Sequence, residues 1–290
     1  MTRAPDTDRP AFATGPGLYA VSDLHAGARD NRPVLQRIRP RHPDDWLIVA
    51  GDVAERLDDI EQALTLLRDR FAKVLWAPGN HELWTNSDDG DDLRGVRRYE
   101  YLVELCRRLG VTTPEDPYPL WDGLEGTVRI APLFLLYDYT FLTPGTTSRQ
   151  ESLEAAQAAS LVFSDEYLLH PDPYPSREDW CRARIEATQP RLAAAAGHPL
   201  VLVSHWPLVR EPTRALRHQQ IAQWCGTERT ADWHVRFGAT VAVYGHLHIP
   251  RTSYHDGVRF EEVSIGYPRE WQRYGLRSDL ARLVLPGTPA

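Results

Sequence analysis

Residues 46–52 read WLIVAGD, a short apolar run that ends in glycine and aspartate. An apolar stretch of this length without an internal charge is typical of a strand that is buried on both faces of a sheet. Four other runs have a similar form, and each also ends in a polar residue. We predict strands at all five places: LYAVSD (18–23), WLIVAGD (46–52), KVLWAPGN (73–80), LVLVSH (200–205) and ATVAVYGH (239–246).

Amphipathic stretches lie between these predicted strands. Residues 60–67 and 101–109 carry apolar side chains at helical spacing, and the second stretch is followed by Gly110, a residue type that commonly ends helices. The alternation of strands and helices predicts parallel pairing in an α/β fold. Near the end of the chain, Asp256 and Gly257 lie between alternating residues, which predicts a β-hairpin.

The length of 290 residues suits one large domain. We predict this domain over residues 18–285, after a disordered leader at 1–17 and before a short tail at 286–290. Residues 140–180 are rich in proline, tyrosine and small polar residues, and they interrupt the alternation of strands and helices. We interpret them as an insertion with a helix near 150–162, which is either a lid or partner-binding surface or a packed connector.

The composition narrows the classes of function. A net charge of −7 weighs against a protein that follows nucleic-acid backbones, because phosphate contacts need basic surface. No stretch is apolar enough over enough residues to span a membrane, and residues 1–17 lack the apolar core of a secretory signal. Cys106, Cys181 and Cys225 are far apart and suit reduced thiols. We predict a cytoplasmic protein without a membrane partner and without nucleic acid as its partner.

The polar residues at and just beyond the ends of the predicted strands form a candidate metal site. Carboxyl ends of parallel strands meet at one edge of a sheet, so side chains from distant parts of the chain converge there. Each residue alone has an ordinary explanation as a turn, a helix cap or a core histidine. Chance poorly explains why five successive runs should each finish in a possible ligand. The candidate ligands are Asp23, His25, Asp52, Asn80, His205, His246 and His248.

The donor types indicate which metals the site would bind. Three carboxylate or amide groups and four imidazoles suit Mn or Fe, with Zn as a further possibility, better than Mg or Ca. Seven ligands exceed the usual protein shell of one ion. The set therefore predicts two metal ions that share a carboxylate.

The motifs DLH (23–25), GDVAE (51–55), GNHE (79–82), SHWP (204–207) and GHLH (245–248) follow one another along the chain. This series resembles the calcineurin-like metallophosphoesterases. The resemblance implies a four-layer α/β/β/α sandwich of two mixed β-sheets flanked by helices. It also implies that Asp52 bridges two metals, the first held by Asp23, His25 and His248 and the second by Asn80, His205 and His246.

The same resemblance implies a reaction. A hydroxide between the metals would attack phosphorus in line, while His81 would stabilise the phosphoryl oxygens or protonate the leaving group. The family commonly has an aspartate paired with this histidine, and this sequence has Glu55 at that position. Our hypothesis is that Glu55 orients His81; the alternative is a first-turn glutamate that is favoured by the helix dipole. Glu82 could either support the ligands through hydrogen bonds or be structural, and we favour the structural interpretation.

Further runs bear on the substrate. FAKVLWAPGNHELW (71–84) and VYGHLHIPRTSYHDGVRFEEVSIGYPREW (243–271) are similar to an actinobacterial subgroup that includes 4′-phosphopantetheinyl hydrolases. That similarity implies hydrolysis of the phosphodiester that joins phosphopantetheine to a serine of an acyl carrier protein. The alternative is a general phosphodiesterase or phosphatase acting on nucleotides or other small phosphoesters. A nuclease or a non-catalytic scaffold fits less well.

Two groups of side chains could recognise such a substrate. Carrier proteins are usually acidic, and arginines suit carboxylates, although solvated surface arginine is the ordinary explanation. The two arginine clusters are Arg210, Arg214 and Arg217, and Arg269, Arg273 and Arg277. Aromatic residues near the motifs could line a groove for the pantetheine arm or belong to the core: Trp76, Trp84, Trp206, Trp271, Tyr137 and Tyr139.

Overall fold

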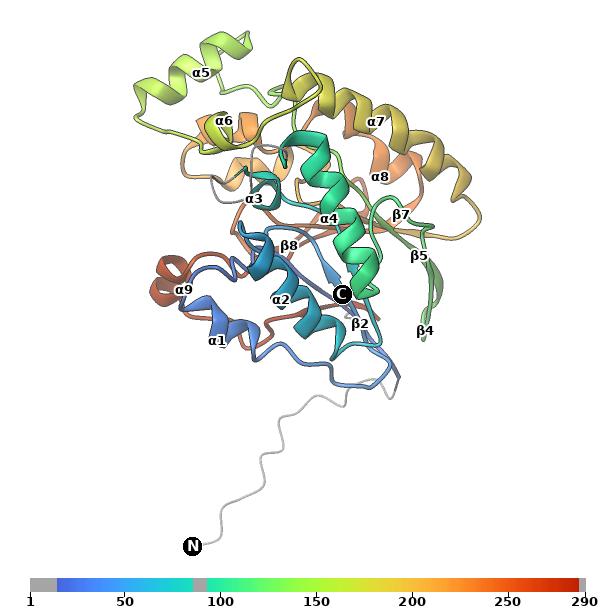
Figure 1. Cartoon of the computed structure of the whole chain (residues 1–290). Helices are drawn as coiled ribbons and strands as arrows, with labels where there is room; N and C mark the ends of the chain where they lie inside the picture. Colours follow the sequence, from blue (N-terminus) through green and yellow to red (C-terminus); the bar gives the residue numbers. More distant parts are fainter. Residues whose placement is uncertain (1–14, 86–92, 287–290) are drawn as a thin grey trace, which may run out of the picture.

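The computed structural model describes residues 15–85 and 93–286, so most of the predicted leader and tail lie outside the described residues. In this part of the chain two β-sheets lie face to face with helices outside them (Figure 1). The first sheet has the order β10-β1-β2-β3 and the second has the order β4-β5-β6-β7-β9-β8. Each sheet contains parallel and antiparallel pairs. The predicted four-layer sandwich of two mixed sheets is confirmed.

All five predicted runs form strands, and the hairpin at Asp256 and Gly257 joins β8 to β9 with positive φ angles of 49° and 79°. The ten strands have the following bounds: β1 (Leu18–Val21), β2 (Trp46–Val49), β3 (Lys73–Trp76), β4 (Leu120–Gly123), β5 (Gly126–Pro132), β6 (Leu200–Val203), β7 (Ala239–Tyr244), β8 (Arg251–His255), β9 (Val258–Glu262) and β10 (Arg282–Leu285).

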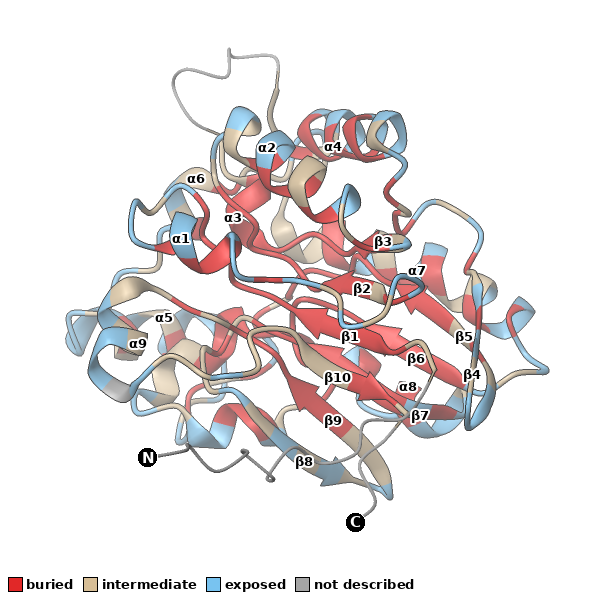
Figure 2. Ribbon diagram, turned by 90° about the horizontal axis from the view of Figure 1, so that it is seen from below, coloured by how far each residue is buried: buried red, intermediate tan, exposed pale blue. Residues whose placement is uncertain are grey.

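Apart from Lys73 at the start of β3, the five predicted apolar strands are uncharged along their length because both faces are buried (Figure 2). Ile48 and Leu75 point into the space between the sheets, where they belong to the same core cluster as Val201 and Val243 of the second sheet. The alternate residues of β1, β2 and β3 join a second core cluster that includes apolar residues of α2 (Leu57–Arg68) and α4 (Gly95–Leu109). The period-two alternation of a strand thus divides its side chains between two cores.

The predicted helices are present, and Gly110 ends α4 in a left-handed conformation with φ of 76°. The helix expected near 150–162 is α5, which is followed by the single turn α6. None of the described helices combines the length and apolarity that crossing a membrane requires. The helices are α1 (Asn31–Leu35), α2 (Leu57–Arg68), α3 (Asn80–Leu83), α4 (Gly95–Leu109), α5 (Arg149–Ala158), α6 (Asp165–Leu168), α7 (Arg177–Ala194), α8 (Trp233–Arg236) and α9 (Pro268–Tyr274), with 3-10 turns at Glu211–Ala215, Gln219–Trp224 and Glu228–Thr230.

The two sheets touch beyond the carboxyl end of β1. Ser22 donates its backbone N–H to the carbonyl of Val263, and Ile265 donates to the carbonyl of Ser22. Nearby, the loop after β2 approaches the loop after β3 so closely that a Cβ on Gly51 would lie 2.6 Å from the backbone nitrogen of Gly79. This crowding brings the ends of strands from both sheets to one place.

Two glycines test that close approach, because Gly51 and Gly110 both have positive φ, of 86° and 76°. A Cβ on Gly110 would meet no atom within 4 Å. We expect Gly110→Ala to lower the free energy of unfolding by about 1–2 kcal/mol through backbone strain alone. Gly51→Ala adds overpacking and should cost about 2–5 kcal/mol in total. Denaturant unfolding measures both, and equal losses would contradict the crowding at Gly51.

Candidate metal centre

The seven predicted ligands lie in the loops that follow β1, β2, β3, β6 and β7, at the carboxyl end of each strand. All are buried except His246 and His248, which are only partly exposed. Strands of both sheets therefore supply donors to one region, as the sequence predicts. Only Asn80 begins a helix, the short α3.

The backbone at these positions is strained. Nine non-glycine residues of the described chain have positive φ, and five of them are predicted ligands. A left-handed conformation is uncommon for such residues, costs on the order of 1–3 kcal/mol, and is concentrated at functional sites. The five are Asp23, His25, Asp52, His246 and His248, with φ between 40° and 69°.

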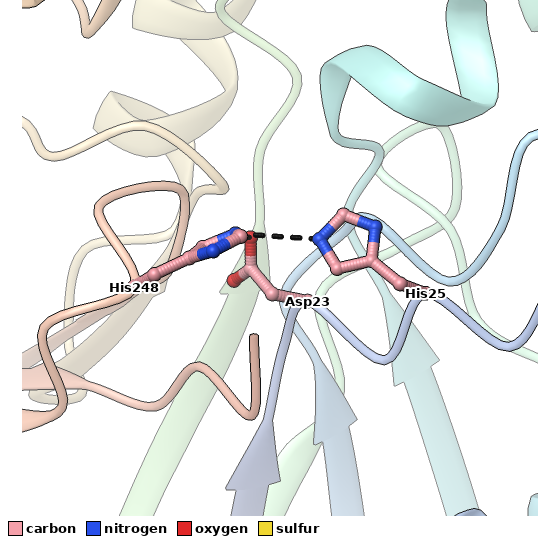
Figure 3. Close-up of side chains that lie close together, drawn as sticks. All are labelled: Asp23, His25 and His248. Atoms are coloured by element: carbon pink, nitrogen blue, oxygen red, sulfur yellow. Dashed lines mark hydrogen bonds and ion pairs between the residues drawn. The ribbon is translucent and has the colours of Figure 1, made fainter. Parts of the chain in front are cut away.

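The first group of donors consists of Asp23, His25 and His248, whose side chains point toward one another (Figure 3). The Nε2 atom of His248 lies 2.9 Å from Oδ1 of Asp23 and 3.3 Å from Nε2 of His25. Ligand atoms that surround one cation at about 2.1 Å are spaced by roughly 3 Å. These three side chains therefore have the spacing of a metal site.

The second group consists of Asn80, His205 and His246. Oδ1 of Asn80 lies 3.1 Å from Nε2 of His205 and 3.1 Å from Nδ1 of His246, and these two nitrogens are also 3.1 Å apart. Asp52 lies between the groups. Its carboxylate is within 4.8 Å of a ring nitrogen of His25 on one side, and within the same distance of ring nitrogens of His205 and His246 on the other. A shared carboxylate at this position fits two adjacent cations.

The outer hydrogen bonds fix the tautomers of two histidines. Nδ1 of His248 lies 2.7 Å from a carboxylate oxygen of Glu270, and Nδ1 of His205 lies 2.9 Å from the carbonyl oxygen of Ala50. With Nδ1 bonded to an oxygen, the neutral form of each ring would present the lone pair of Nε2 to a cation. This chemistry fits the imidazole-binding metals Mn, Fe and Zn.

The two buried aspartates are suited to ligand binding as anions. Burial alone would raise the pKa of Asp52, but His205 and His81 outweigh burial and hold this pKa well below its usual range. Burial likewise opposes ionisation of Asp23, and His248 outweighs it so that the pKa of Asp23 is lowered. Carboxylates that stay ionised in a buried site are available to cations.

His81 lies beside the donor groups and contacts residues from two other segments. Its Nδ1 is 3.0 Å from a carboxylate oxygen of Glu55, and its Nε2 is 3.1 Å from the hydroxyl of Tyr267. Burial would lower the pKa of His81, but Asp52 and then Glu55 outweigh burial and raise it. A histidine with a raised pKa can carry a proton near neutral pH, as a general acid must.

The start of helix α2 distinguishes between the two interpretations of Glu55, as a partner of His81 or as a first-turn glutamate. Helix α2 begins at Leu57, so Glu55 precedes the helix and is not in its first turn. The first-turn alternative is therefore wrong. Glu82, in contrast, is buried and accepts hydrogen bonds from three backbone N–H groups and one indole, which fits the structural role that the sequence predicts for it.

Three residues of the site have no counterpart in the sequence prediction. Tyr267 also stacks on His25 with ring centroids 4.1 Å apart, Glu270 binds His248, and Asp165 accepts a hydrogen bond from Asn80. These partners are far apart along the chain. Glu270 is 22 residues from His248, and Tyr267 is 242 residues from His25. Separations of this size leave no periodic pattern in the sequence from which the contacts could be predicted.

The aromatic and arginine candidates divide by environment. Trp84 packs against His81 with centroids 3.7 Å apart, and Trp271 donates to Oδ1 of Asn31 at 2.9 Å. The other four aromatic candidates are buried in the core: Trp76, Trp206, Tyr137 and Tyr139. Among the arginines, Arg210 donates to the carbonyl of Leu142 and Arg277 pairs with Asp279, while four are exposed: Arg214, Arg217, Arg269 and Arg273.

Comparison with known proteins agrees with this geometry. The family model described as calcineurin-like phosphoesterase matches residues 18–250. The chain is 54% identical over 272 residues to the acyl-carrier-protein phosphodiesterase PptH of Mycobacterium tuberculosis, an alignment that covers 93% of this chain and 84% of that protein. The crystal structure of phosphopantetheinyl hydrolase PptH from the same organism matches with a TM-score of 0.92 and 53% identity, over 95% of this chain and 99% of that chain.

The family and the donor groups together indicate that the site binds divalent metal ions. The long match to the family model, the identity to PptH and the shared fold lead to one conclusion. This chain belongs to the calcineurin-like phosphoesterase family.

Proposed function

We propose that this protein is a two-metal phosphodiesterase that removes 4′-phosphopantetheine from holo acyl carrier proteins and leaves the apo form. The observation that carries the proposal is the pair of donor groups around Asp52 with His81 beside them. The similarity to PptH, named as an acyl-carrier-protein phosphodiesterase, extends over 93% of this chain and supports the substrate.

In this proposal Asp52 is shared between the two groups of ligands. Mn or Fe ions, or Zn, bound there would lower the pKa of water and stabilise the charge that develops on the phosphoryl oxygens. The first ion would be held by Asp23, His25 and His248, and the second by Asn80, His205 and His246.

The reaction adds water across the bond between phosphorus and the serine oxygen of the carrier. His81 would donate its proton to that oxygen, or stabilise the phosphoryl oxygens, through Nε2. Glu55 would act on the other ring nitrogen, because a carboxylate that accepts from Nδ1 fixes the ring and favours its protonated form. Glu55 is thus proposed as a positioning residue.

Charge supports a docking site near α9 for an acidic carrier protein. Tyr267, which directly precedes this helix, contacts His81. Glu270, within the helix, contacts His248. Arg269 and Arg273 are exposed on the same helix, and the guanidinium of Arg269 lies 5.0 Å from the ring centroid of Tyr267. We therefore favour Arg269 and Arg273 over the cluster at 210–217. The cytoplasmic location and the lid at 140–180 stay predictions.

The substrate is tested by the intact mass of a holo acyl carrier protein incubated with the enzyme and Mn²⁺. We expect loss of the phosphopantetheine mass with the wild type and no loss with His81→Ala or after chelation of the metal. An aryl phosphodiester is assayed in parallel. Rapid diester cleavage without any change in carrier mass would refute the substrate and favour a general phosphodiesterase.

The role of Glu55 is tested by Glu55→Ala, which removes the acceptor for Nδ1 of His81. We expect kcat to fall about 10–100-fold with KM little changed, the usual range for loss of such an outer partner. Glu61→Ala, on the exposed side of α2, serves as the matched control and should leave kcat unchanged. Wild-type kcat in Glu55→Ala would eliminate the proposed role.

Docking is tested by the charge reversals Arg269→Glu and Arg273→Glu in one protein. We expect kcat/KM for the carrier protein to fall about tenfold at low salt, less at high salt, and kcat/KM for the aryl diester to stay unchanged. The reversal Arg214→Glu with Arg217→Glu is the comparison. Unchanged carrier kinetics in both double variants would contradict docking through either cluster.

A further inference from the structure

Asp165 lies in the segment 140–180, yet it contacts the candidate metal centre. It is the first residue of α6 and is fully buried. Its Oδ1 accepts a hydrogen bond of 2.9 Å from Nδ2 of Asn80 and one of 2.6 Å from the indole nitrogen of Trp84. An acidic side chain of the predicted insertion therefore touches a residue that we propose as a metal ligand.

This contact selects one of the two orientations of the Asn80 amide. Oδ1 of Asp165 accepts from the indole N–H of Trp84, which can only donate, so this oxygen acts as an acceptor. It therefore pairs with the NH₂ group of Asn80 and turns the amide oxygen away. The oxygen of Asn80 then faces His205 and His246, 3.1 Å from a nitrogen of each. The flipped amide would present hydrogens to the metal position, and its oxygen would face the carboxylate of Asp165.

The carboxylate of Asp165 is not needed to anchor the segment 140–180 to the rest of the protein. Within the described residues, the side-chain hydrogen bonds to the carboxylate of Asp165 come from Trp84, Asn80 and Tyr137, which all lie outside the segment 140–180. The neighbouring Glu166 instead provides side-chain anchors: it accepts from Tyr139 and Trp224, each at 2.7 Å, and pairs with Arg177 at 3.0 Å. The carboxylate of Asp165 is thus directed at Asn80 and Trp84 rather than at the rest of the segment.

We propose that Asp165 is a positioning residue for the second metal, because it holds the oxygen of Asn80 toward the donors of His205 and His246. The segment 140–180 then supplies part of the metal centre. The inference rests on the metal site of the proposed function, but it does not depend on which phosphoester is the substrate.

The test is Mn²⁺ titration of the metal-free full-length chain by calorimetry. We expect Asp165→Ala to weaken the second site about 10–100-fold, the range seen when the outer partner of a metal ligand is removed. The first site should change little. Asp165→Asn keeps the volume and one carbonyl, and we expect about a threefold or larger loss because the charge assistance is gone. If Asp165→Ala does not fold, Asp165→Asn decides, and wild-type affinity in it would overturn the proposal.

Two further variants separate positioning from packing. Glu166→Gln weakens an anchor of the same helix without touching a predicted ligand, and it should bind Mn²⁺ like the wild type. In an Asn80→Ala background, adding Asp165→Ala should change the affinity by less than about twofold, because the pair acts as one unit. An equal loss in Glu166→Gln, or an additive loss in the double variant, would show that Asp165 does not act through Asn80. No substrate is present, so these results stand even if carrier proteins are not cleaved.

Discussion

The carboxylate of Glu82 holds together the two loops on which the candidate metal centre depends. Its oxygens accept hydrogen bonds from the backbone N–H groups of Asp52, Val53 and Gly79 at 2.9 to 3.0 Å, and from the indole of Trp76 at 3.2 Å. Burial, with Asp52 close by, raises the pKa of Glu82 to about 7. The loop after β2 is thereby fixed against the loop after β3. Asp52 and Asn80 take their places from this contact.

The crowding around these loops also accounts for the strained backbone. Asp23 donates its backbone N–H to the carbonyl of Gly51 and His25 donates to the carbonyl of Asp52, so the loop after β1 is tied to the loop after β2. His246 in turn donates its backbone N–H to the carboxylate of Asp23. These bonds offset the cost of left-handed conformations, and they direct the side chains into one volume at the carboxyl ends of strands from both sheets.

Three outer partners come from segments that contribute no ligand themselves. Glu270 orients His248, Tyr267 contacts His81, and Asp165 faces Asn80. Residues of α6 and α9 therefore border the site. Outer partners of this kind fix ring orientation and amide orientation, which the ligand residues alone leave open.

The sequence by itself determined the five central strands, the hairpin at 256–257 and the positions of the candidate ligands. Each of these is a local pattern: a strand with two buried faces must be apolar along its length, and the residues after it fall at the edge of the sheet. The resemblance of the motifs added the pairing of two sheets. Only the tertiary structure decided that Glu55 contacts His81 from outside the helix, that four of the six aromatic candidates are core residues, and that Asp165, Tyr267 and Glu270 border the site. Hydrogen bonds between side chains 22 to 186 residues apart depend on how the chain packs, and packing leaves no periodic signal in the sequence.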